Sequence, residues 1–390
     1  MKYLIIGGGI AGTTAAGHIR KEDPKAQVTI IDAEQHRLYS RVLIPHYVKG
    51  MIDREKIFLK KEDWYGKKGI ELMSGVEVLS VDTKNKFVAT SEGRELPFDK
   101  LLVTTGGDVR LYGEDKRGVS YLRTLDDADQ LIQLINETKD RAGDANRAIV
   151  YGGGFITLEF INIFAAHKIP TTVVMRGSIF GKHFSREMQD LFINHLRSKG
   201  VEVLENQKEL TLLGKTEVEG VRLTDGREIP TSILGVGIGS TFEAPFLEGT
   251  GVEIDGGIKA NVYLETTAEN IYTAGDVANF EDEHMGRFIR YGNWMTAQMQ
   301  ARVLGKTMTG TRTKFDLVSS LAINVVGMEV VTIGDSDRGA ADAVRVIASE
   351  DGSALEVFDR SGVTVGAAML GDVSKRSAIT KAIKEKVLYK

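Results

Sequence analysis

Three glycines near the amino terminus have the spacing of a phosphate-binding turn. Gly7, Gly9 and Gly12 form the pattern G-x-G-x-x-G directly after the apolar run Lys2–Ile6. Gly7 permits a tight turn, Gly9 lets the backbone approach a pyrophosphate, and Gly12 lets a following helix close on the strand. Asp32 stands 20 positions after Gly12, where a carboxylate accepts hydrogen bonds from an adenosine ribose. This order predicts a dinucleotide site, and the alternative is a glycine-rich turn in an ordinary βαβ unit.

The elements that position these residues are two strands and the helix between them. The strands are expected at Lys2–Ile6 and 28–31, and the helix begins at the glycine turn. The amino terminus of that helix faces the pyrophosphate, because its free N–H groups favour an anion. Ile10, Ala11 and Ala33 flank the turn and the acid, and they are assigned to the same site.

A second glycine-rich turn repeats the pattern 145 positions later. The strand Ala148–Tyr151 leads into Gly152, Gly153 and Gly154, followed by a helix at 155–167 and a strand at 171–175. A repeat at this distance indicates two nucleotide-binding units rather than a solenoid. One chain with two adenine-nucleotide sites is typical of a flavoprotein supplied by a nicotinamide cofactor.

The second unit departs from the ideal pattern. Thr157 takes the place of the third glycine, which loosens the contact between helix and strand. Met175 and Arg176 follow the second strand, where sites for NAD carry an acid. An arginine there suits a 2′-phosphate, and Lys182 could add a second positive charge, so the sequence favours NADPH over NADH. The alternative for Arg176 is a solvated loop charge.

Composition limits the possible classes. A chain of 390 residues is expected to form two or three domains. With 50 basic and 54 acidic residues, nothing suggests a nucleic-acid partner or an anionic membrane. No apolar run is long enough to suggest a membrane helix, and a strand rather than a signal peptide begins the sequence, so a soluble, cytoplasmic protein is expected. The chain has no cysteine, which excludes a disulfide framework, a thiolate metal site and a redox-active cysteine pair. No metal site is expected.

Periodicity predicts further elements along the chain, and residues 36–50 read as irregular. The expected helices lie at 57–66, 126–137, 190–199, Trp294–Met308 and 376–386. The expected strands lie at 76–82, Phe87–Thr90, 101–104, 201–204, 271–274 and Val363–Leu370, and the stretch 233–239 ends the second lobe.

Four motifs together resemble the pyridine nucleotide-disulfide oxidoreductase superfamily. They are the first glycine turn with Asp32, the turn T-T-G-G at 104–107, G-G-G-F-I-T-L-E at 152–159 and T-A-G-D at 273–276. The segment Y-S-R-V-L-I-P-H-Y-V-K-G at 39–50 resembles the flavin portion of assimilatory nitrite reductases and rubredoxin reductases. The spacing over 286–310 is similar to rubredoxin reductase and apoptosis-inducing factor, although Ala301 stands where those relatives have Gly. The thiol-using branches need a cysteine near Ile44, and its absence excludes their chemistry.

The resemblance implies an α/β fold with two Rossmann-like dinucleotide-binding domains and a small α+β carboxyl-terminal domain. Residues 1–110 and 245–315 would form a discontinuous FAD-binding domain. Residues 111–244 would bind NAD(P), and residues 316–390 would form an interface or dimerisation domain.

The resemblance also implies roles for individual residues around FAD. Asp276 would accept a hydrogen bond from the ribitol, with a helix start after it near the second phosphate; the alternative is an acid that caps that helix. Trp294 would border the pyrimidine end of the isoalloxazine, and the alternative is a core Trp. Arg41 would place a positive charge near the flavin or pyrophosphate, or lie on a surface loop. The other residues assigned to FAD are Gly7, Gly9, Gly12, Asp32, Val76, Thr104, Thr105, Gly106 and Gly275.

On the nicotinamide side, the resemblance implies a role for Glu159. In the family this acid lies near the nicotinamide and flavin, and we expect it to position the nicotinamide, because hydride transfer needs alignment more than acid catalysis. The alternative is an acid on the first turn of its helix that interacts favourably with the helix dipole. The other candidates are Gly152, Gly154, Ile156, Arg176 and Gly237.

The leading hypothesis is an FAD-dependent NAD(P)H oxidoreductase that passes electrons from the flavin to a one-electron acceptor such as rubredoxin or ferredoxin. Without a thiol relay, the reduced flavin must itself be the donor. One alternative is an NAD(P)H oxidase or quinone reductase. Another is a flavin-binding protein whose nicotinamide site has decayed, which Thr157 and Met175 motivate. A homodimer through the carboxyl-terminal region is a further possibility.

Overall fold

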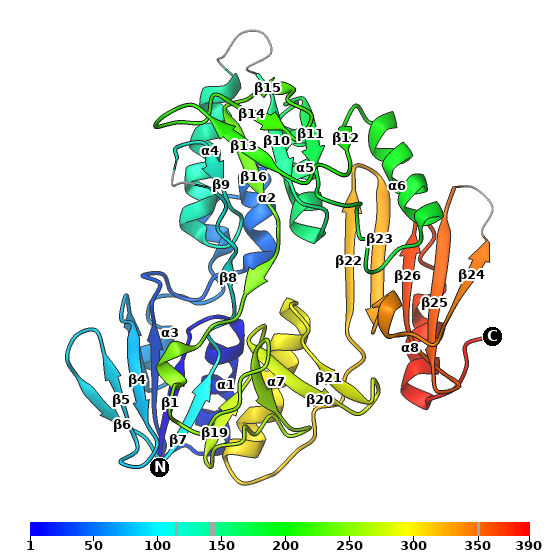
Figure 1. Cartoon of the computed structure of the whole chain (residues 1–390). Coiled ribbons are helices and arrows are strands. Elements are labelled where there is room, and N and C mark those ends of the chain that lie inside the picture. Colours follow the sequence, from blue (N-terminus) through cyan, green and yellow to red (C-terminus); the bar gives the residue numbers. More distant parts are fainter. Residues whose placement is uncertain (114–115, 140–145, 349–351) are drawn as a thin grey trace. The chain divides into compact units, whose positions relative to one another are not determined.

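A computed structural model describes residues 1–113, 116–139, 146–348 and 352–390. The chain divides into two compact units, and each is interrupted in sequence (Figure 1). The first unit contains residues 1–40, 54–108 and 241–319. The second contains residues 41–53, 109–240 and 320–390. The short strands β8 (Asp108–Val109) and β17 (Ser240–Thr241) lie where the chain passes between them.

A five-stranded parallel sheet organises the first unit, with the strand order β19-β7-β1-β2-β3. Along β1, alternate side chains enter cores on opposite faces, as the pleat of a strand requires. Tyr3 and Ile5 belong to one core, and Leu4 and Ile6 belong to the other. The strands are β1 (Lys2–Ile6), β2 (Gln27–Asp32), β3 (Ile70–Ser74), β7 (Lys100–Val103) and β19 (Ile271–Thr273).

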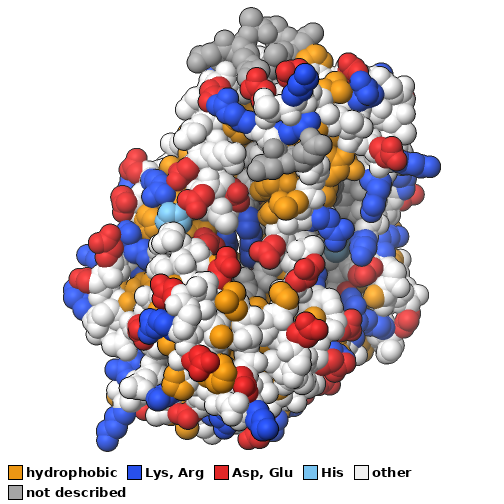
Figure 2. All heavy atoms as spheres, turned by 60° about the vertical axis from the view of Figure 1, so that its left-hand side comes forward, with side chains coloured by type: hydrophobic (Ala, Val, Ile, Leu, Met, Phe, Trp, Pro, Cys, Tyr) orange, Lys and Arg blue, Asp and Glu red, His pale blue; other side chains and the backbone are white. Residues whose placement is uncertain are grey.

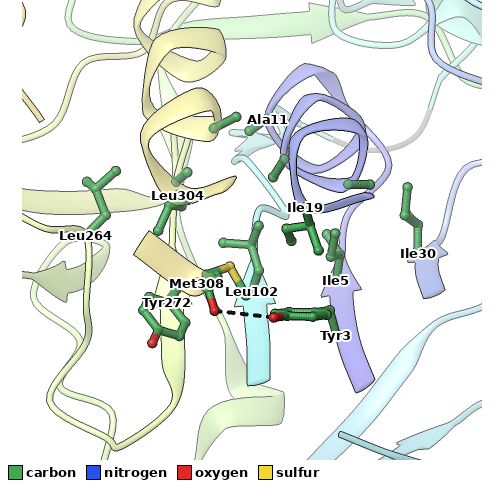
Figure 3. Close-up of a cluster of buried hydrophobic side chains, with 14 of the residues drawn as sticks. Tyr3, Ile5, Ala11, Ile19, Ile30, Leu102, Leu264, Tyr272, Leu304 and Met308 are labelled. Atoms are coloured by element: carbon green, nitrogen blue, oxygen red, sulfur yellow. Dashed lines mark hydrogen bonds between the residues drawn. The ribbon is translucent and has the colours of Figure 1, made fainter. Parts of the chain in front are cut away.

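Two helices cover one face of this sheet, α1 (Ile10–Glu22) and α7 (Trp294–Met308). Figure 3 shows their apolar side chains meeting those of the sheet, with Ile19 of α1 and Leu304 of α7 above Leu102. The Tyr3 hydroxyl donates to the carbonyl oxygen of Met308 across 3.5 Å, which ties the end of α7 to β1. The position of both helix starts relative to the sheet is therefore fixed by packing.

Smaller elements complete the first unit. An antiparallel sheet contains β4 (Val78–Asp82), β5 (Phe87–Thr90) and β6 (Glu95–Pro97). A second small sheet contains β18 (Ile258–Ala260), β20 (Ala278–Asp282) and β21 (Arg287–Ile289). Short helical turns are η2 (Arg54–Ile57), α3 (Trp64–Lys67) and η4 (Pro245–Leu247).

The second unit contains another five-stranded parallel sheet, with the order β12-β11-β10-β16-β9. Its strands are β9 (Val119–Ser120), β10 (Ala148–Tyr151), β11 (Thr171–Val174), β12 (Glu202–Leu204) and β16 (Ile233–Val236). Its helices are α4 (Leu125–Lys139), α5 (Phe155–Ala166) and α6 (Arg186–Ser198). A small antiparallel sheet contains β13 (Leu210–Leu213), β14 (Gly220–Leu223) and β15 (Glu228–Pro230). The turn η1 (Arg41–Leu43) and helix α2 (Ile44–Val48) also belong to this unit.

The carboxyl-terminal part of the second unit is an antiparallel sheet with the order β22-β23-β26-β25-β24. The strands are β22 (Ser320–Val325), β23 (Met328–Gly334), β24 (Ala343–Ala348), β25 (Ala354–Arg360) and β26 (Val363–Leu370). The turn η5 (Arg338–Ala340) connects β23 to β24, and α8 (Arg376–Glu385) packs against β23 and β26. Asn162 on α5 joins this sheet to the parallel one, because its amide donates to the Asn324 carbonyl oxygen across 2.7 Å.

The α/β fold with two Rossmann-like parallel sheets and a small carboxyl-terminal α+β part is confirmed. Two local predictions are wrong. A continuous helix over 57–66 does not form, because residues 57–59 pair with 38–40: the N–H of Leu59 donates to the carbonyl oxygen of Leu38, and the N–H of Ser40 donates to that of Ile57. Only the last residues of the range are helical, in α3. Residues 36–50 are not irregular throughout, since they contain η1 and α2.

Charged side chains of both signs are interspersed on the face of the molecule that Figure 2 shows. This agrees with the small net charge of −4. No helix within the described parts of the chain combines the length and apolar character that crossing a membrane requires.

Candidate functional site

The first glycine turn lies at the carboxyl edge of the parallel sheet, between β1 and α1. Gly7 adopts φ +103°, and a Cβ there would lie 2.4 Å from the carbonyl oxygen of Thr104. A Cβ on Gly12 would lie 2.0 Å from the carbonyl oxygen of Gly7. The Thr104 hydroxyl lies within hydrogen-bonding distance of two carbonyl oxygens, that of Ile6 at 3.0 Å and that of Gly7 at 2.9 Å. These contacts link the ends of β1 and β7. Gly7 and Gly12 are therefore required for close backbone packing.

Gly9 has a different environment. It precedes α1 with φ −64° and ψ −168°, and a Cβ there would meet no protein atom within 4 Å. The first turn of α1 carries no acid, and no side chain caps the helix start. This open space beside free helix N–H groups fits the pyrophosphate of a dinucleotide.

Asp32 ends β2 beside the same turn. A Cβ on Gly8 would lie 2.4 Å from an oxygen of the Asp32 carboxylate, so acid and turn are in direct contact. The main chain of Asp32 accepts a hydrogen bond from the N–H of Val76 across 3.0 Å, and Ala33 follows directly. The structure thus brings Val76 and Asp32 together, although 44 positions separate them in the sequence.

The T-A-G-D turn after β19 also lies at this edge. A Cβ on Gly275 would lie 3.5 Å from the Cβ of Ala11 on α1. The N–H of Gly275 donates to the side-chain oxygen of Gln300 on α7 across 2.8 Å. Gln300 is buried, and its role in shaping this turn was not predicted. The sequence feature that could have identified Gln300 is its polar side chain on a face of α7 that also carries Ala297, Ala301 and Leu304.

The alternative role of Asp276 as a helix cap is wrong, because no helix starts there. β20 begins at Ala278, and the next helix, α7, is capped by the Asn293 side chain, which accepts from the N–H of Thr296. The first helix after Asp276 is α7, which starts 18 positions later at Trp294. Trp294 is its first residue, and it is half-buried and absent from the buried core, which disfavours the core alternative.

Arg290 is a cation of the first unit that sequence reasoning missed. Its guanidinium lies 3.4 Å from the ring centre of Phe242, and a Cβ on Gly107 would lie 2.3 Å from that ring. Burial lowers the pKa of Arg290, and the charge of Asp276 opposes this shift. The contact of Arg290 with residues near the T-T-G-G and T-A-G-D turns comes only from the fold, so no local signal could have identified it.

The other residues assigned to FAD lie at the same edge of the first sheet, except Arg41, which belongs to the second unit. Thr105 and Gly106 follow β7, and Ile10 begins α1. Arg41 belongs to the second unit, where its guanidinium donates to the carbonyl oxygen of Arg123. That contact fixes the side chain within the second unit.

The second glycine turn has the same construction as the first. Gly152 adopts φ +140°, and a Cβ there would lie 2.2 Å from the carbonyl oxygen of Gly237, which follows β16. A Cβ on Gly154 would meet nothing within 4 Å, and α5 starts without a side-chain cap. Ile156 is 42% exposed beside this open space. The turn therefore fits a second dinucleotide phosphate.

Thr157 does not disturb this turn. The residue is fully buried, and its hydroxyl lies near Gly152 and Gly237 without a hydrogen-bond partner in the described structure. Met175 is buried after β11, so its place offers no acid to a ribose. Arg176 is exposed in the loop that follows. Gly153 lies against this loop, because a Cβ on Gly153 would be 3.2 Å from the carbonyl oxygen of Ser178.

Glu159 is the fifth residue of α5, and the first turn of that helix carries no acid. The expectation that Glu159 lies on the first turn is wrong, and the helix-dipole alternative loses its basis. Burial raises the pKa of Glu159, and the charge of Lys49 opposes the shift. Lys49 follows α2, which packs against α5 in the same unit. Within the described residues, no group of three His, Asp or Glu side chains could hold a metal ion.

The family model described as "Pyridine nucleotide-disulphide oxidoreductase" matches residues 1–301. The chain belongs to this family. Pyridine nucleotide-disulphide oxidoreductases and the reductases related to this chain use FAD with NAD(P)H, so the chain is an FAD-dependent oxidoreductase. Both glycine turns have the open space that such cofactors need.

Among curated relatives, the chain is 29% identical over 392 aligned residues to a nitrite reductase [NAD(P)H] of Bacillus subtilis (strain 168). The alignment covers 98% of this chain and 47% of that protein, so the chain spans about half the length of this relative.

Among solved structures, the chain resembles the putidaredoxin reductase–putidaredoxin complex with a TM-score of 0.90 at 20% identity, over 99% of this chain and 93% of that one. It also resembles NADH:rubredoxin oxidoreductase from Clostridium acetobutylicum with a TM-score of 0.82 at 22% identity, over 100% and 96% of the two chains. At these identities the likeness establishes the fold.

Proposed function

We propose that this oxidoreductase takes electrons from NAD(P)H and passes them singly from its flavin to a small redox protein such as a rubredoxin or ferredoxin. The observation that carries the proposal is that the family's two dinucleotide turns occur in a chain with no cysteine. No thiol of this chain can relay electrons, so the flavin is left as the direct donor. Two structural neighbours, the putidaredoxin reductase–putidaredoxin complex and NADH:rubredoxin oxidoreductase, act with small redox proteins of this kind and support this acceptor class.

In this proposal, the first unit holds FAD. Gly7, Gly9 and Gly12 shape the pyrophosphate site, and Asp32 accepts hydrogen bonds from the adenosine ribose. Asp276 accepts from the ribitol, and the start of α7 at Trp294 stabilises negative charge at the pyrimidine end of the flavin ring. The remaining contacts come from Ile10, Ala11, Ala33, Val76, Thr104, Thr105, Gly106 and Gly275. When bound, FAD accepts a hydride and releases its electrons to the acceptor.

The second unit holds the nicotinamide nucleotide. Gly152, Gly154, Ile156 and Gly237 surround its phosphates, and Glu159 positions the nicotinamide. Glu159 suits a positioning role, because it is half-buried on α5 and burial raises its pKa, while the charge of Lys49 opposes that shift. Arg41 supplies a positive charge near the flavin or the pyrophosphate of FAD.

We expect NADPH to be preferred over NADH. Arg176 is exposed in the loop after β11, and the buried Met175 offers no carboxylate to a ribose 2′-hydroxyl. The loop lies against Gly153, which places it beside the second turn. A cation in such a place favours a 2′-phosphate.

The proposal is tested by reducing the FAD-loaded protein under anaerobic conditions with NADPH and with NADH. We expect the flavin absorbance to bleach faster with NADPH, and rubredoxin or ferredoxin added afterwards to restore it. Failure of both nucleotides to bleach the flavin would overturn the proposal. Turnover with oxygen or a soluble quinone that equals turnover with rubredoxin would instead identify an oxidase or quinone reductase. A yellow protein without affinity for either nucleotide would indicate a decayed nicotinamide site. The cytoplasmic location and the homodimer stay predictions.

A further inference from the structure

The loop between β11 and α6, residues 175–185, is part of the wall of the second glycine turn. The N–H of Phe180 donates to the carbonyl oxygen of Gly153 across 2.9 Å. The rings of Phe180 and Phe155 lie 4.8 Å apart, and Phe155 is the first residue of α5. Phe180 holds φ +49°, a backbone conformation that a bulky residue rarely adopts and that the surrounding contacts must maintain. The shape of the turn therefore depends on where this loop is held.

The other side of the same loop is held by the carboxyl-terminal sheet. The carbonyl oxygen of Lys182 accepts from the N–H of Arg338 across 2.9 Å. The ring nitrogen Nδ1 of His183 lies 3.0 Å from the hydroxyl and 3.1 Å from the carbonyl oxygen of Ser336. Both partners lie between β23 and β24, so a segment more than 150 positions away fixes the loop.

Glu356 on β25 is the centre of this attachment. Its side chain is 1% exposed and forms an ion pair with Arg338. Each carboxylate oxygen also accepts from the N–H of Ser185 across 3.2 Å. Ser185 caps α6, because its hydroxyl accepts from the N–H of Met188 across 3.2 Å. One buried carboxylate thus joins the end of the loop, the start of α6 and the turn that contacts Lys182.

We propose that Glu356 is a positioning residue for the adenine-ribose end of the nicotinamide nucleotide, acting through Ser185 and Arg338 on the loop that carries Arg176 and Lys182. The carboxyl-terminal sheet thereby contributes to nucleotide recognition without touching the nucleotide. This inference rests on the proposed function, since it requires that the nucleotide binds at the second glycine turn.

The test is Glu356→Gln in the full-length, FAD-loaded protein. The amide keeps the shape of the side chain but removes the charge that pairs with the partly buried Arg338, which weakens the attachment of the loop. Calorimetry with adenosine 2′,5′-bisphosphate reports the adenine-ribose end directly. We expect its affinity to fall about tenfold, or about 1.4 kcal/mol. We expect KM for NADPH to rise similarly, with kcat at saturation and the flavin spectrum unchanged.

The same sheet offers a matched control. Asp359 on β25 forms a comparable ion pair with Arg345 at 2.5 Å, with its carboxylate 9% exposed. Neither residue is bonded to the loop in the described structure. Asp359→Asn is expected to lower stability and leave adenosine 2′,5′-bisphosphate affinity unchanged. Equal loss of affinity in both variants would mean general destabilisation and would overturn the inference.

A milder variant keeps the inference testable if Glu356→Gln does not fold. Ser336→Ala removes only the hydroxyl near His183, and we expect a smaller loss of affinity in the same direction. If Glu356→Gln does not fold and Ser336→Ala binds the bisphosphate like the parent, the inference is wrong. If the parent protein binds neither the bisphosphate nor NADPH, the proposed function itself has failed. Normal binding by the parent together with normal binding by a folded Glu356→Gln variant rejects this inference alone.

Discussion

Gly9 and Gly12 of the first turn differ in what a side chain would meet at each position. A Cβ on Gly12 would enter the carbonyl oxygen of Gly7, whereas a Cβ on Gly9 would project into open space. The backbone of Gly9 is extended, with φ −64°, so alanine can adopt it without strain. Close packing of the fold therefore requires glycine at position 12 but not at position 9.

This contrast leads to a prediction for Gly9→Ala and Gly12→Ala. Gly9→Ala is expected to weaken FAD binding by tenfold or more, on the order of 1.4 kcal/mol, because the methyl group takes the place of the pyrophosphate. Its apoprotein should unfold in urea like the parent apoprotein. Gly12→Ala should lower both FAD affinity and apoprotein stability, by about 1–3 kcal/mol for the latter. Fluorescence titration with FAD and urea unfolding measure the two quantities, and equal stability loss in both variants would contradict the assignment.

The preference between the two nicotinamide nucleotides should depend on Arg176. If it binds the 2′-phosphate, Arg176→Ala should raise KM for NADPH about tenfold and change KM for NADH by less than twofold, because NADH lacks that phosphate. Steady-state rates with each nucleotide measure this. Arg227, which is paired with Asp225 on a loop between β14 and β15, offers a control, and Arg227→Ala should change neither constant. A uniform effect of Arg176→Ala on both nucleotides would favour the solvated-charge alternative.

At the scale of elements, the close contact of α1 and α7 sets the position of both helix starts. A Cβ on Gly305 of α7 would lie 2.3 Å from the Cβ of His18 on α1. Gly305→Ala is therefore expected to push the helices apart and lower the free energy of unfolding by about 1–3 kcal/mol. Urea unfolding provides the measurement.

Gly17 of α1 is the matched control for this prediction. A Cβ there would lie 3.6 Å from Trp64, which is ordinary van der Waals contact. Gly17→Ala should be neutral or stabilising by up to about 1 kcal/mol, since alanine favours a helix more than glycine does. Similar destabilisation by both substitutions would show that the His18 contact is not the cause.

The elements that could be predicted from the sequence are those with strong local signals. β1, β10, α7 and β26 have the expected bounds, because each combines an apolar run or period with clear ends. Segments whose state depends on a distant partner could not be predicted. The stretch 57–66 has a helical period, yet backbone hydrogen bonds at residues 57 and 59 join it to residues 38–40, and only its end is helical. The short strands β13, β14 and β15 have three or four residues each, too few to establish a period.

The candidate site shows the same division. Glycine spacing located both turns, since Gly7, Gly12 and Gly152 leave no room for a Cβ beside neighbouring backbone. Gln300, Phe180 and Arg290 were missed, because their contacts with the turns form only when distant segments pack.

Three partly buried histidines predict that the folded protein is sensitive to acid. Burial lowers the pKa of His18, His46 and His183 below the ordinary value of 6.5. Near pH 6.5 these histidines therefore bind protons in the unfolded chain but not in the folded one. As a result, the free energy of unfolding falls as the pH falls below about 6.5. Burial raises the pKa of Glu159 and Asp282, and these carboxyls act in the opposite direction.

NMR of the protein with labelled histidine isolates this effect. The imidazole signals of the three residues should titrate with midpoints below 6.5, and urea unfolding should show less stability at pH 5.5 than at pH 7.5. His18→Gln should reduce that difference, because glutamine does not titrate. Midpoints at or above 6.5 would contradict the burial argument.

The interleaving of the two units has a consequence for synthesis of the chain. The first unit begins with β1 but needs β19 at 271–273 and α7 at 294–308 to complete its sheet and cover it. Until the ribosome has released those residues, the core that contains Tyr3 and Ile5 has the cover of α1 but lacks that of α7, so most of the protein emerges before the first unit can close. Cutting the gene between the units cannot yield two self-sufficient fragments, because no single cut separates segments that alternate along the sequence. The chain is therefore expected to fold as a whole, so a fusion partner or a chaperone would have to serve the entire chain.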